Sequence, residues 1–224
     1  IRRDTFVGEK RAVPAAEDEA GTMLVPACGR ALAGHEIRIV DAAGDELPDR
    51  QVGCLQFRGP SATRGYFRNP EATARLFRDG WLDSGDYAYM VEGEIYLTGR
   101  VKDLIIRGGR NLYPYELEEA VGAIPGIRKG CVAVFASTDP ANATERLVLL
   151  AETREQDAEA LEALRRKINE AAIDAVGMPA DEIVLAPPHS VLKTSSGKIR
   201  RAASREAFER GEVGRRQAPA WMQQ

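Results

Sequence analysis

The sequence has little of what would mark a secreted, membrane or nucleic-acid-binding protein. Its three cysteines, Cys28, Cys54 and Cys131, are an odd number at wide spacing and do not predict a disulfide framework. No apolar run is long enough to cross a bilayer, and no leading apolar segment resembles a signal peptide. The formal net charge of −3 provides no global basic field for nucleic acid. These features predict a cytoplasmic protein with no transmembrane segment and no nucleic-acid partner.

Histidine is also scarce, and the residue types that build metal centres are dispersed. His35 and His189 stand apart from each other and from the cysteines, so no spacing typical of a zinc site occurs and we expect structural roles for both. Hydrophobic residues make up 44% and charged residues 29%, which is ordinary for a globular protein, and the length allows one domain or two. We therefore predict no metal site and look for function in short polar motifs.

The pattern of expected elements changes about midway along the chain. Residues 22–101 hold short alternating strands separated by glycine and proline turns, which predicts a small β-barrel or sandwich. Strands then alternate with helices, the longest over residues 158–176, where apolar residues recur with helical spacing. We predict an α+β fold, with a β-barrel-like subdomain within residues 1–101 and a separate α/β lobe within residues 102–224.

The beginning of the sequence carries few structural signals. Residues 1–21 are charged and contain no reliable helix start, so no element is assigned there. They also lack an initiating methionine, and we interpret the sequence as part of a longer chain. Residues 22–34 contain Pro26, Gly29 and Gly34 and are expected to form a loop.

A short turn near the C-terminus combines hydroxyl groups, a glycine and flanking basic residues. It runs from Lys193 to Lys198 with the sequence KTSSGK. Such a turn can bring backbone N–H groups and an ammonium close to an anionic group. It is not a Walker A loop, because no glycine opens it and Ile199, rather than serine or threonine, follows Lys198. Taken alone, it also fits a solvated basic loop that precedes an amphipathic helix.

Two further motifs precede this turn, and the three together resemble a known family. They are Ser84-Gly85-Asp86, which we interpret as a turn before a hairpin, and the GRVKD segment over residues 99–103. In order and approximate spacing, the three motifs resemble those of the adenylate-forming superfamily of acyl/aryl-CoA synthetases, luciferases and peptide-synthetase adenylation domains. The surrounding sequence, over most of residues 20–213, looks like fatty-acyl-AMP ligases.

The resemblance implies two nucleotide contacts in the first half of the chain. Asp86 would accept hydrogen bonds from the ATP ribose hydroxyls, because an ionised carboxylate offers acceptors only. Arg100 would contact ribose or phosphate oxygens with its planar guanidinium. The simpler alternatives are an Asx-turn at Asp86 and a surface ion pair of Arg100 with a neighbour such as Glu94.

Lys198 is the implied catalytic residue and would also contact the nucleotide. In acyl adenylation a carboxylate oxygen attacks the α-phosphate of ATP and pyrophosphate leaves. Two anions must be held together while charge grows on the phosphoryl oxygens, and a fixed ammonium offsets this repulsion. In the family a proline usually precedes the basic residue that opens this motif, and here that position is Leu192, which puts the rigidity of the turn in question.

The resemblance also implies a moving part. Lys102 would be the hinge between the large N-terminal portion and a mobile C-terminal domain, since hinge residues often stand at the ends of elements. Gly108, Gly109 and Arg110 would form a loop that faces the acceptor thiol in the second half-reaction. The simpler alternatives are an exposed lysine and a plain strand-to-helix turn.

The implied activity is that of a ligase that converts a fatty acid and ATP to acyl-adenylate and passes the acyl group to the phosphopantetheine of an acyl carrier protein or polyketide synthase. The first alternative is a fatty-acyl-CoA synthetase with CoA as the acceptor. The second is a carrier-docking module without catalysis. ATP and Mg²⁺ are the implied cofactors, bound mainly by a part of the enzyme upstream of this sequence. We therefore expect that this polypeptide alone does not turn over ATP.

Overall fold

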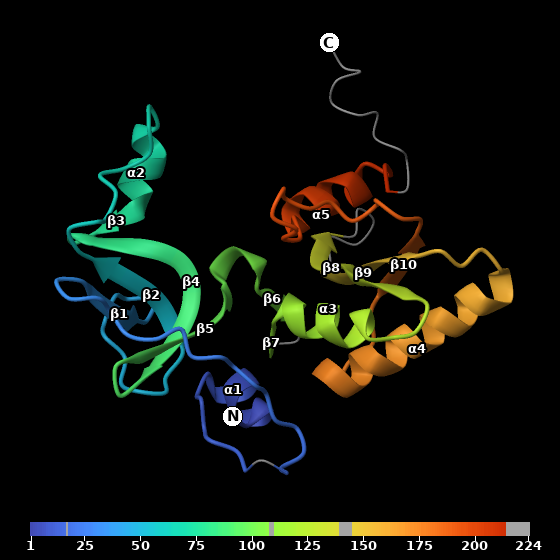
Figure 1. The fold of residues 1–224 in the computed structure, drawn as a ribbon, viewed down its shortest axis with the longest axis horizontal. Helices are drawn as coiled ribbons and strands as arrows, with labels where there is room; N and C mark the ends of the chain where they lie inside the picture. The colour runs from blue at the N-terminus through green and yellow to red at the C-terminus, as the bar shows by residue number, and fades with distance from the viewer. Residues whose placement is uncertain (17, 108–109, 139–144, 214–224) are drawn as a thin grey trace. The chain divides into compact units, whose positions relative to one another are not determined.

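The computed structural model describes residues 1–16, 18–107, 110–138 and 145–213 (Figure 1). The chain forms two units, Ile1–Asn111 and Leu112–Gln224, which are described separately below as unit 1 and unit 2. The division confirms the α+β fold class, with a β-rich part followed by an α/β part. The hinge at Lys102 concerns movement and stays a prediction.

Unit 1 is built on a curled, half-barrel sheet of antiparallel strands. The strand order is β1-β2-β4-β3, and β5 also pairs with β4. Alternate residues of these strands turn inward, so that Ile39, Leu55, Ala88 and Ile95 form its buried cluster. The bounds of the strands are β1 (Glu36–Val40), β2 (Gly53–Arg58), β3 (Phe77–Arg78), β4 (Trp81–Val91) and β5 (Glu94–Arg100).

A tight hairpin joins the two strands that carry the predicted nucleotide contacts. Val91, the last residue of β4, pairs with Glu94, the first residue of β5. Between them, Glu92 and Gly93 have φ values of 50° and 82°. Two consecutive positive φ angles are typical of a type I′ turn, whose twist matches that of the adjoining strands. The hairpin predicted from the sequence is thus present.

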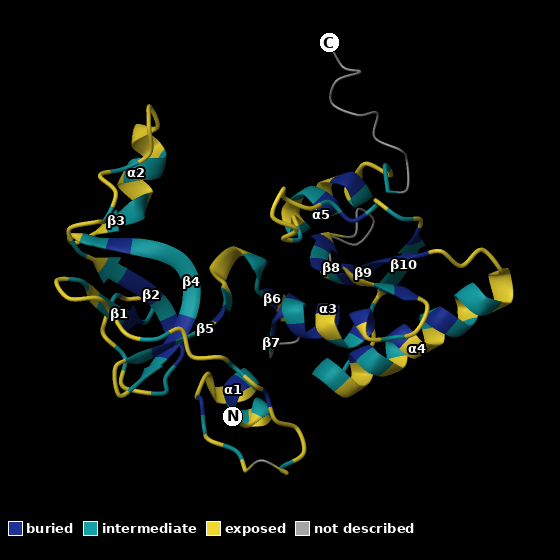
Figure 2. Ribbon diagram, in the orientation of Figure 1, coloured by how far each residue is buried: buried dark blue, intermediate teal, exposed yellow. Residues whose placement is uncertain are grey.

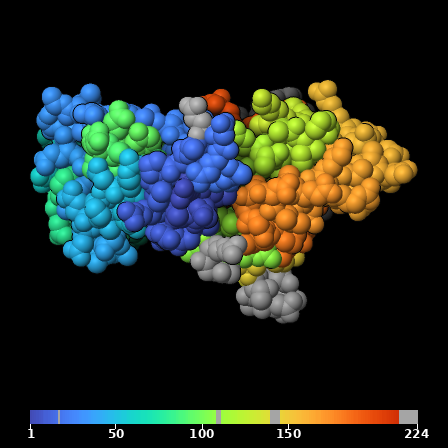
Figure 3. Space-filling model, turned by 90° about the horizontal axis from the view of Figure 1, so that it is seen from below, coloured from blue at the N-terminus to red at the C-terminus, as the bar shows by residue number. Residues whose placement is uncertain are grey.

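In unit 1 one element was left unassigned from the sequence and one expectation is wrong. The helix α1 (Arg3–Glu9) forms in the segment that was left unassigned, because Phe6 is completely buried and packs edge-on against Tyr89 with ring centroids 6.4 Å apart. This stabilisation is tertiary and leaves no capping signal. In addition, Ser84-Gly85-Asp86 is not a turn before the hairpin but lies inside the continuous strand β4. Figure 3 shows residues of the N-terminal segment, in dark blue, on the surface.

Short elements lie between the strands of unit 1 and after its last long strand, β5. Helix α2 (Pro70–Leu76) begins with proline, and Oδ1 of Asn69 accepts a hydrogen bond from the Ala72 N–H at 3.0 Å. Strand β5 leads into the 3₁₀ helix η1 (Val101–Asp103), then into β6 (Ile105–Arg107), which pairs with β7 (Arg110–Leu112).

Unit 2 is a three-stranded sheet with helices on both faces. The strand order is β10-β9-β8, with β8 antiparallel and β10 parallel to the central β9. Figure 1 shows α3 and α4 on one side of this sheet and α5 on the other, and Figure 2 shows buried residues concentrated along β8 and β9. The bounds are α3 (Pro114–Gly122), β8 (Ile127–Thr138), β9 (Glu145–Thr153), α4 (Ala158–Val176), β10 (Glu182–Ala186) and α5 (Arg201–Glu209).

The sequence explains why these elements form. Oδ2 of Asp157 accepts a hydrogen bond from the Ala160 N–H at 2.9 Å and caps α4, and Gly177, with φ 76°, ends it. The run Leu147–Ala151 in β9 is buried on both faces, as expected of a central strand covered by helices. None of the described helices is long and apolar enough to cross a membrane.

Candidate functional site

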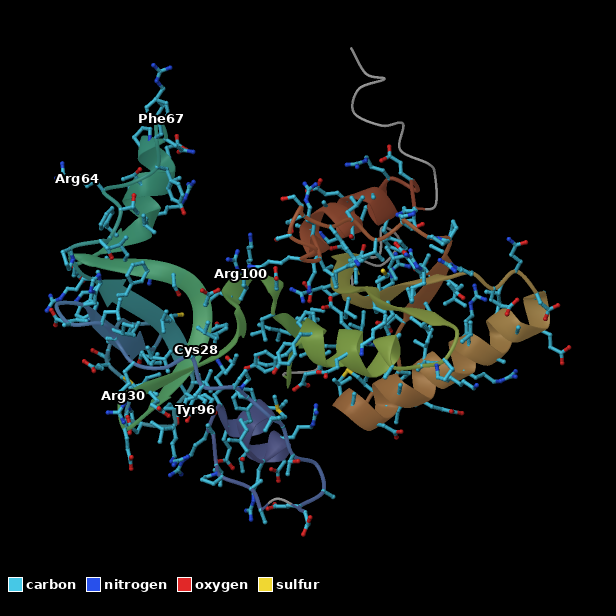
Figure 4. All side chains as sticks on the ribbon, viewed as in Figure 1. Cys28, Arg30, Arg64, Phe67, Tyr96 and Arg100 are labelled. Atoms are coloured by element: carbon cyan, nitrogen blue, oxygen red, sulfur yellow. The ribbon has the colours of Figure 1, made fainter. Side chains whose placement is uncertain are left out.

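A carboxylate and a guanidinium, both predicted to contact a nucleotide, lie opposite each other on β4 and β5. Asp86 and Arg100 are register partners, and Nε of Arg100 lies 3.4 Å from Oδ1 of Asp86. The Asp86 side chain is 26% exposed and that of Arg100, at the end of β5 in Figure 4, is 59% exposed. An ion pair with this much solvent contributes little to stability, so both groups remain available to a ligand. Glu94, the suggested partner of Arg100, instead accepts a hydrogen bond from the Tyr96 hydroxyl.

The backbone around Asp86 is shaped by its neighbours rather than by its own side chain. Oδ1 of Asp83 accepts a hydrogen bond from the Gly85 N–H at 2.8 Å, and Oγ of Ser84 accepts one from the Asp86 N–H at 3.0 Å. Gly85 has φ 73°, and the strand register shifts just beyond, between Tyr87 and Ala88. Such irregularities re-aim side chains at functional positions. The Asx-turn is therefore made by Asp83, which leaves the carboxylate of Asp86 for other partners.

The turn near the C-terminus is a small closed hairpin. Lys193 and Ile199 form a bridge, and the Thr194 N–H donates to the Lys198 carbonyl at 2.8 Å. The Gly197 N–H donates to the Thr194 carbonyl at 2.9 Å, while Oγ1 of Thr194 accepts from the Lys198 N–H at 3.1 Å. Gly197 has φ 84°, which glycine adopts without strain. These bonds hold the turn even though Leu192 replaces the proline of the related motif.

The two lysines of the turn have different surroundings. Nζ of Lys193 lies 3.1 Å from Sγ of Cys131, which is buried in β8. Lys198 is exposed and, within the ranges that the structure describes, forms no ion pair. Its ammonium can therefore approach an anion without first breaking a protein contact. Both lysines are exposed, and they differ in that, among the described residues, only the ammonium of Lys193 contacts another side chain.

Two buried carboxylates, which the sequence analysis did not single out, bond to residues on either side of the turn. Glu152 is 1% exposed, pairs with Arg128 and accepts a hydrogen bond from the Val191 N–H at 2.8 Å. Glu118 is 9% exposed and accepts from Nε and Nη2 of Arg201 at 2.8 and 2.6 Å. The turn is thereby attached to unit 2 before Lys193 and after Lys198.

The other predicted positions are only partly described. Lys102 is exposed at the centre of η1, between the end of β5 and the start of β6. Gly108 and Gly109 lie outside the described residues, and of Arg110 only the backbone, at the start of β7, is described. The structure therefore brings Asp86 and Arg100 together in unit 1 and places Lys198 in unit 2. The hinge and the acceptor loop stay predictions.

The pKa shifts near Asp86 affect its tyrosine neighbours. Burial, followed by the charge of Cys54, raises the pKa of Tyr87. Burial, followed by the charge of Tyr96, raises the pKa of Tyr89 to about 12. Both phenols therefore stay protonated and uncharged around neutral pH. Among the described residues, no group of three or more His, Cys, Asp or Glu side chains could hold a metal ion.

Comparison with known proteins places the chain beside ATP-dependent acid ligases, although no family model matches it. A putative acyl-CoA synthetase of Caulobacter vibrioides is 41% identical over 189 residues, which is 84% of this chain and 32% of that protein. A long-chain-fatty-acid–AMP ligase of Mycobacterium marinum is 36% identical over 73% of this chain and 30% of its own length. The chain thus spans about a third of the length of the curated relatives it matches.

Solved structures agree with these relatives. In a study of fatty acyl-adenylate ligases from E. coli and L. pneumophila, one structure superposes with a TM-score of 0.81 at 35% identity, over 93% of this chain and 37% of that one. The structure of McyG A-PCP with phenylalanyl-adenylate gives 0.76 at 31% identity, over 87% of this chain and 34% of that one. The three motifs, the two units and these likenesses agree: the chain belongs to the adenylate-forming family of acyl-CoA synthetases and fatty-acyl-AMP ligases and corresponds to their C-terminal portion.

Proposed function

We propose that this chain is the C-terminal part of a fatty-acyl-AMP ligase, which activates a fatty acid with ATP to acyl-adenylate and pyrophosphate. The observation that carries the proposal is the exposed ammonium of Lys198 on a turn that hydrogen bonds hold at both ends. Fatty-acid–AMP ligases and fatty acyl-adenylate ligases among the similar proteins support the same reaction class.

Three side chains would act on the nucleotide. Asp86 would accept hydrogen bonds from the ribose hydroxyls, and Arg100 would donate to ribose or phosphate oxygens. Lys198 would hold the attacking carboxylate and the α-phosphate together and would stabilise the charge that grows as pyrophosphate leaves. Mg²⁺ would be bound mainly by the part of these enzymes that the present chain does not match.

The second half-reaction would transfer the acyl group to a thiol. We propose the phosphopantetheine of an acyl carrier protein or polyketide synthase as acceptor, in keeping with the fatty acyl-adenylate ligase likeness. CoA is the alternative acceptor, favoured by the name of the Caulobacter relative. Unit 2 would turn about Lys102 between the two half-reactions, with Gly108, Gly109 and Arg110 facing the acceptor. We also propose a cytoplasmic location, since the three cysteines are free thiols.

The experiment that tests this function uses the intact enzyme that contains the chain. Pyrophosphate exchange that depends on fatty acid measures adenylate formation, and acylation of either CoA or a phosphopantetheinylated carrier protein identifies the acceptor. We expect Lys198→Ala to lower exchange about 10²–10³-fold, and we expect the exposed Lys167→Ala on α4 to leave it unchanged. Exchange near the wild-type rate in Lys198→Ala would contradict the proposal. The 224-residue chain alone is expected to release no pyrophosphate from ATP.

A further inference from the structure

The turn that carries Lys198 has two legs that pair with each other. The first leg comprises residues 191–194 and the second residues 198–201. The Thr194 N–H donates to the Lys198 carbonyl, and the Arg200 N–H donates to the Leu192 carbonyl, both at 2.8 Å. Because the legs are paired, whatever holds one leg in place also limits the movement of the other and of the lysine between them.

The first leg is held by two buried oxygens from other elements. The Val191 N–H donates to Oε1 of Glu152 in β9 at 2.8 Å, and the Leu192 N–H donates to Oγ of Ser204 in α5 at 3.3 Å. Glu152 is 1% and Ser204 0% exposed. Glu152 is in turn oriented by Arg128 of β8. The start of the turn is thereby tied to the centre of the sheet.

The second leg is held by another buried carboxylate. Oε1 and Oε2 of Glu118, on α3, accept from Nε and Nη2 of Arg201, and Oε1 also accepts from the Val134 N–H at 3.1 Å. A bidentate pair fixes direction as well as distance. Between this pair and the turn, Ile199 packs against the core cluster that includes Phe135. The end of the turn is thereby tied to α3 and β8.

A contribution to stability does not by itself explain the Glu152–Arg128 and Glu118–Arg201 ion pairs. Burying a carboxylate costs free energy that its attraction to a partly exposed guanidinium only partly offsets, and apolar replacements of buried ion pairs are often neutral or stabilising. What a buried, fully bonded pair provides is a fixed geometry. Glu152 bonds to the backbone before Lys198 and Glu118 to the side chain of Arg201 after it, and both carboxylates come from elements far away in the sequence.

We propose that Glu152 and Glu118 are positioning residues, which hold the turn so that the ammonium of Lys198 is presented in one place for adenylate formation. The proposal rests on the proposed function of Lys198. Neither carboxylate touches substrate. Their loss should slow the half-reaction that uses Lys198 and leave acyl transfer from preformed adenylate unchanged.

The first test measures the turn itself and does not depend on activity. Glu152→Gln keeps the shape of the side chain and removes its charge. We expect amide hydrogen exchange over residues 191–200 to accelerate about tenfold relative to the amides of β9, because a neutral carboxamide oxygen accepts a weaker hydrogen bond from the Val191 N–H than a carboxylate does. Glu182→Gln is the matched control, because the Arg146–Glu182 pair joins β9 to β10 without touching the turn. Unchanged exchange over residues 191–200 would overturn the proposal.

The second test is kinetic and uses the intact enzyme. Glu152→Gln should lower kcat for pyrophosphate exchange about tenfold, in line with its effect on the turn, while KM for ATP changes less. A merely structural role would lower both half-reactions together through a smaller folded fraction, and that result would overturn the positioning role. Normal exchange in Lys198→Ala would instead overturn the proposed function, and the hydrogen-exchange result would still decide how the turn is held.

Milder variants keep the proposal testable if Glu152→Gln does not fold. Ser204→Ala removes only the acceptor of the Leu192 N–H, and Arg201→Lys keeps the charge but cannot make the bidentate bond. Both should accelerate amide exchange in the turn, by less than Glu152→Gln, and both should lower kcat for adenylate formation in the same proportion. Faster exchange without any loss of kcat in either variant would overturn the positioning role.

Discussion

Unit 1 and unit 2 present their candidate site residues in opposite ways. In unit 1 the candidate groups, Asp86 and Arg100, are partners of each other in a partly solvated ion pair. In unit 2 the candidate group, Lys198, has no ion partner among the described residues, and the carboxylates near it, Glu152 and Glu118, are buried and paired with partly exposed arginines. An anion or hydroxyl group that binds to unit 1 would therefore compete with the Asp86–Arg100 ion pair. In unit 2 the ammonium of Lys198 has no such competitor among the described residues, and the buried carboxylates of Glu152 and Glu118 instead hold the turn that carries it.

The largest expected contrast is in stability. Glu118→Ala in unit 2 removes a carboxylate that a guanidinium and a buried N–H share, and should lower the free energy of unfolding by about 3–5 kcal/mol. Asp86→Ala in unit 1 breaks an exposed pair and should cost less than about 1 kcal/mol. Urea unfolding, with amide exchange followed separately in β8 and β4, measures both. If both variants lost the same free energy of unfolding, the Asp86–Arg100 pair of unit 1 and the Glu118–Arg201 pair of unit 2 would not differ in structural importance.

Asp86→Ala, which should have little effect on stability, should have a large effect on the use of ATP. Asp86→Ala removes a charged acceptor of the ribose hydroxyls, an interaction of about 1.5–3 kcal/mol, so kcat/KM for ATP should fall about 10–100-fold. Glu94→Gln, on the same hairpin, is the control and should have no such effect. The measurement is pyrophosphate exchange in the intact enzyme at varied ATP. A normal value in Asp86→Ala would show that the carboxylate serves only its pair with Arg100.

Unit 1 should also be the unit that is sensitive to alkali. The pKa of Tyr89 is raised to about 12 by burial, so the folded state holds the phenolic proton more tightly than the unfolded state. This contribution is fully present below pH 10 and is lost as the pH rises toward 12, an effect of about 2–3 kcal/mol. Absorbance at 295 nm and circular dichroism over this range measure it. Tyr89→Phe should flatten the loss, whereas the exposed Tyr66→Phe should not.

The smallest expected effects come from two matched glycines. Gly85 and Gly197 have φ values of 73° and 84°, and an added Cβ would meet no other atom within 4 Å at either position. Alanine should therefore cost about 1 kcal/mol at each through backbone strain alone. Gly8→Ala, in α1 with equally open space, is the control and should not destabilise. We expect Gly85→Ala to weaken ATP binding and Gly197→Ala to slow adenylate formation.

Local signals in the sequence predicted some elements well. Helix α4 has the bounds expected from its apolar spacing, because Asp157 and Gly177 mark its ends and its core face is continuous. The β4–β5 hairpin followed from Glu92-Gly93. Helix α1 was missed, because its stability comes from the burial of Phe6 against a strand more than eighty residues away in the sequence.

The residues of the candidate site stay a prediction, and the sequence alone did not show how they are arranged. The family resemblance singled out Lys198, but the different surroundings of Lys193 and Lys198 follow only from the contact of Lys193 with Cys131, sixty-two residues away. Glu152 gave one signal, a charge at the end of an apolar run, but its partners Arg128 and Val191 are distant in the sequence. Non-local contacts of this kind leave no periodic pattern in a single sequence.

The second leg of the turn continues directly into α5, whose Phe208 packs against Phe135 of the sheet. No flexible joint separates the lysine from that helix. A lysine on an independently flexible loop could reach a bound nucleotide by movement of the loop alone. The ammonium of Lys198 would instead reach it only by movement of unit 2 as a whole. If unit 2 turns about Lys102 as proposed above, adenylate formation should depend on the movement of the whole unit, and a more viscous solvent should slow it.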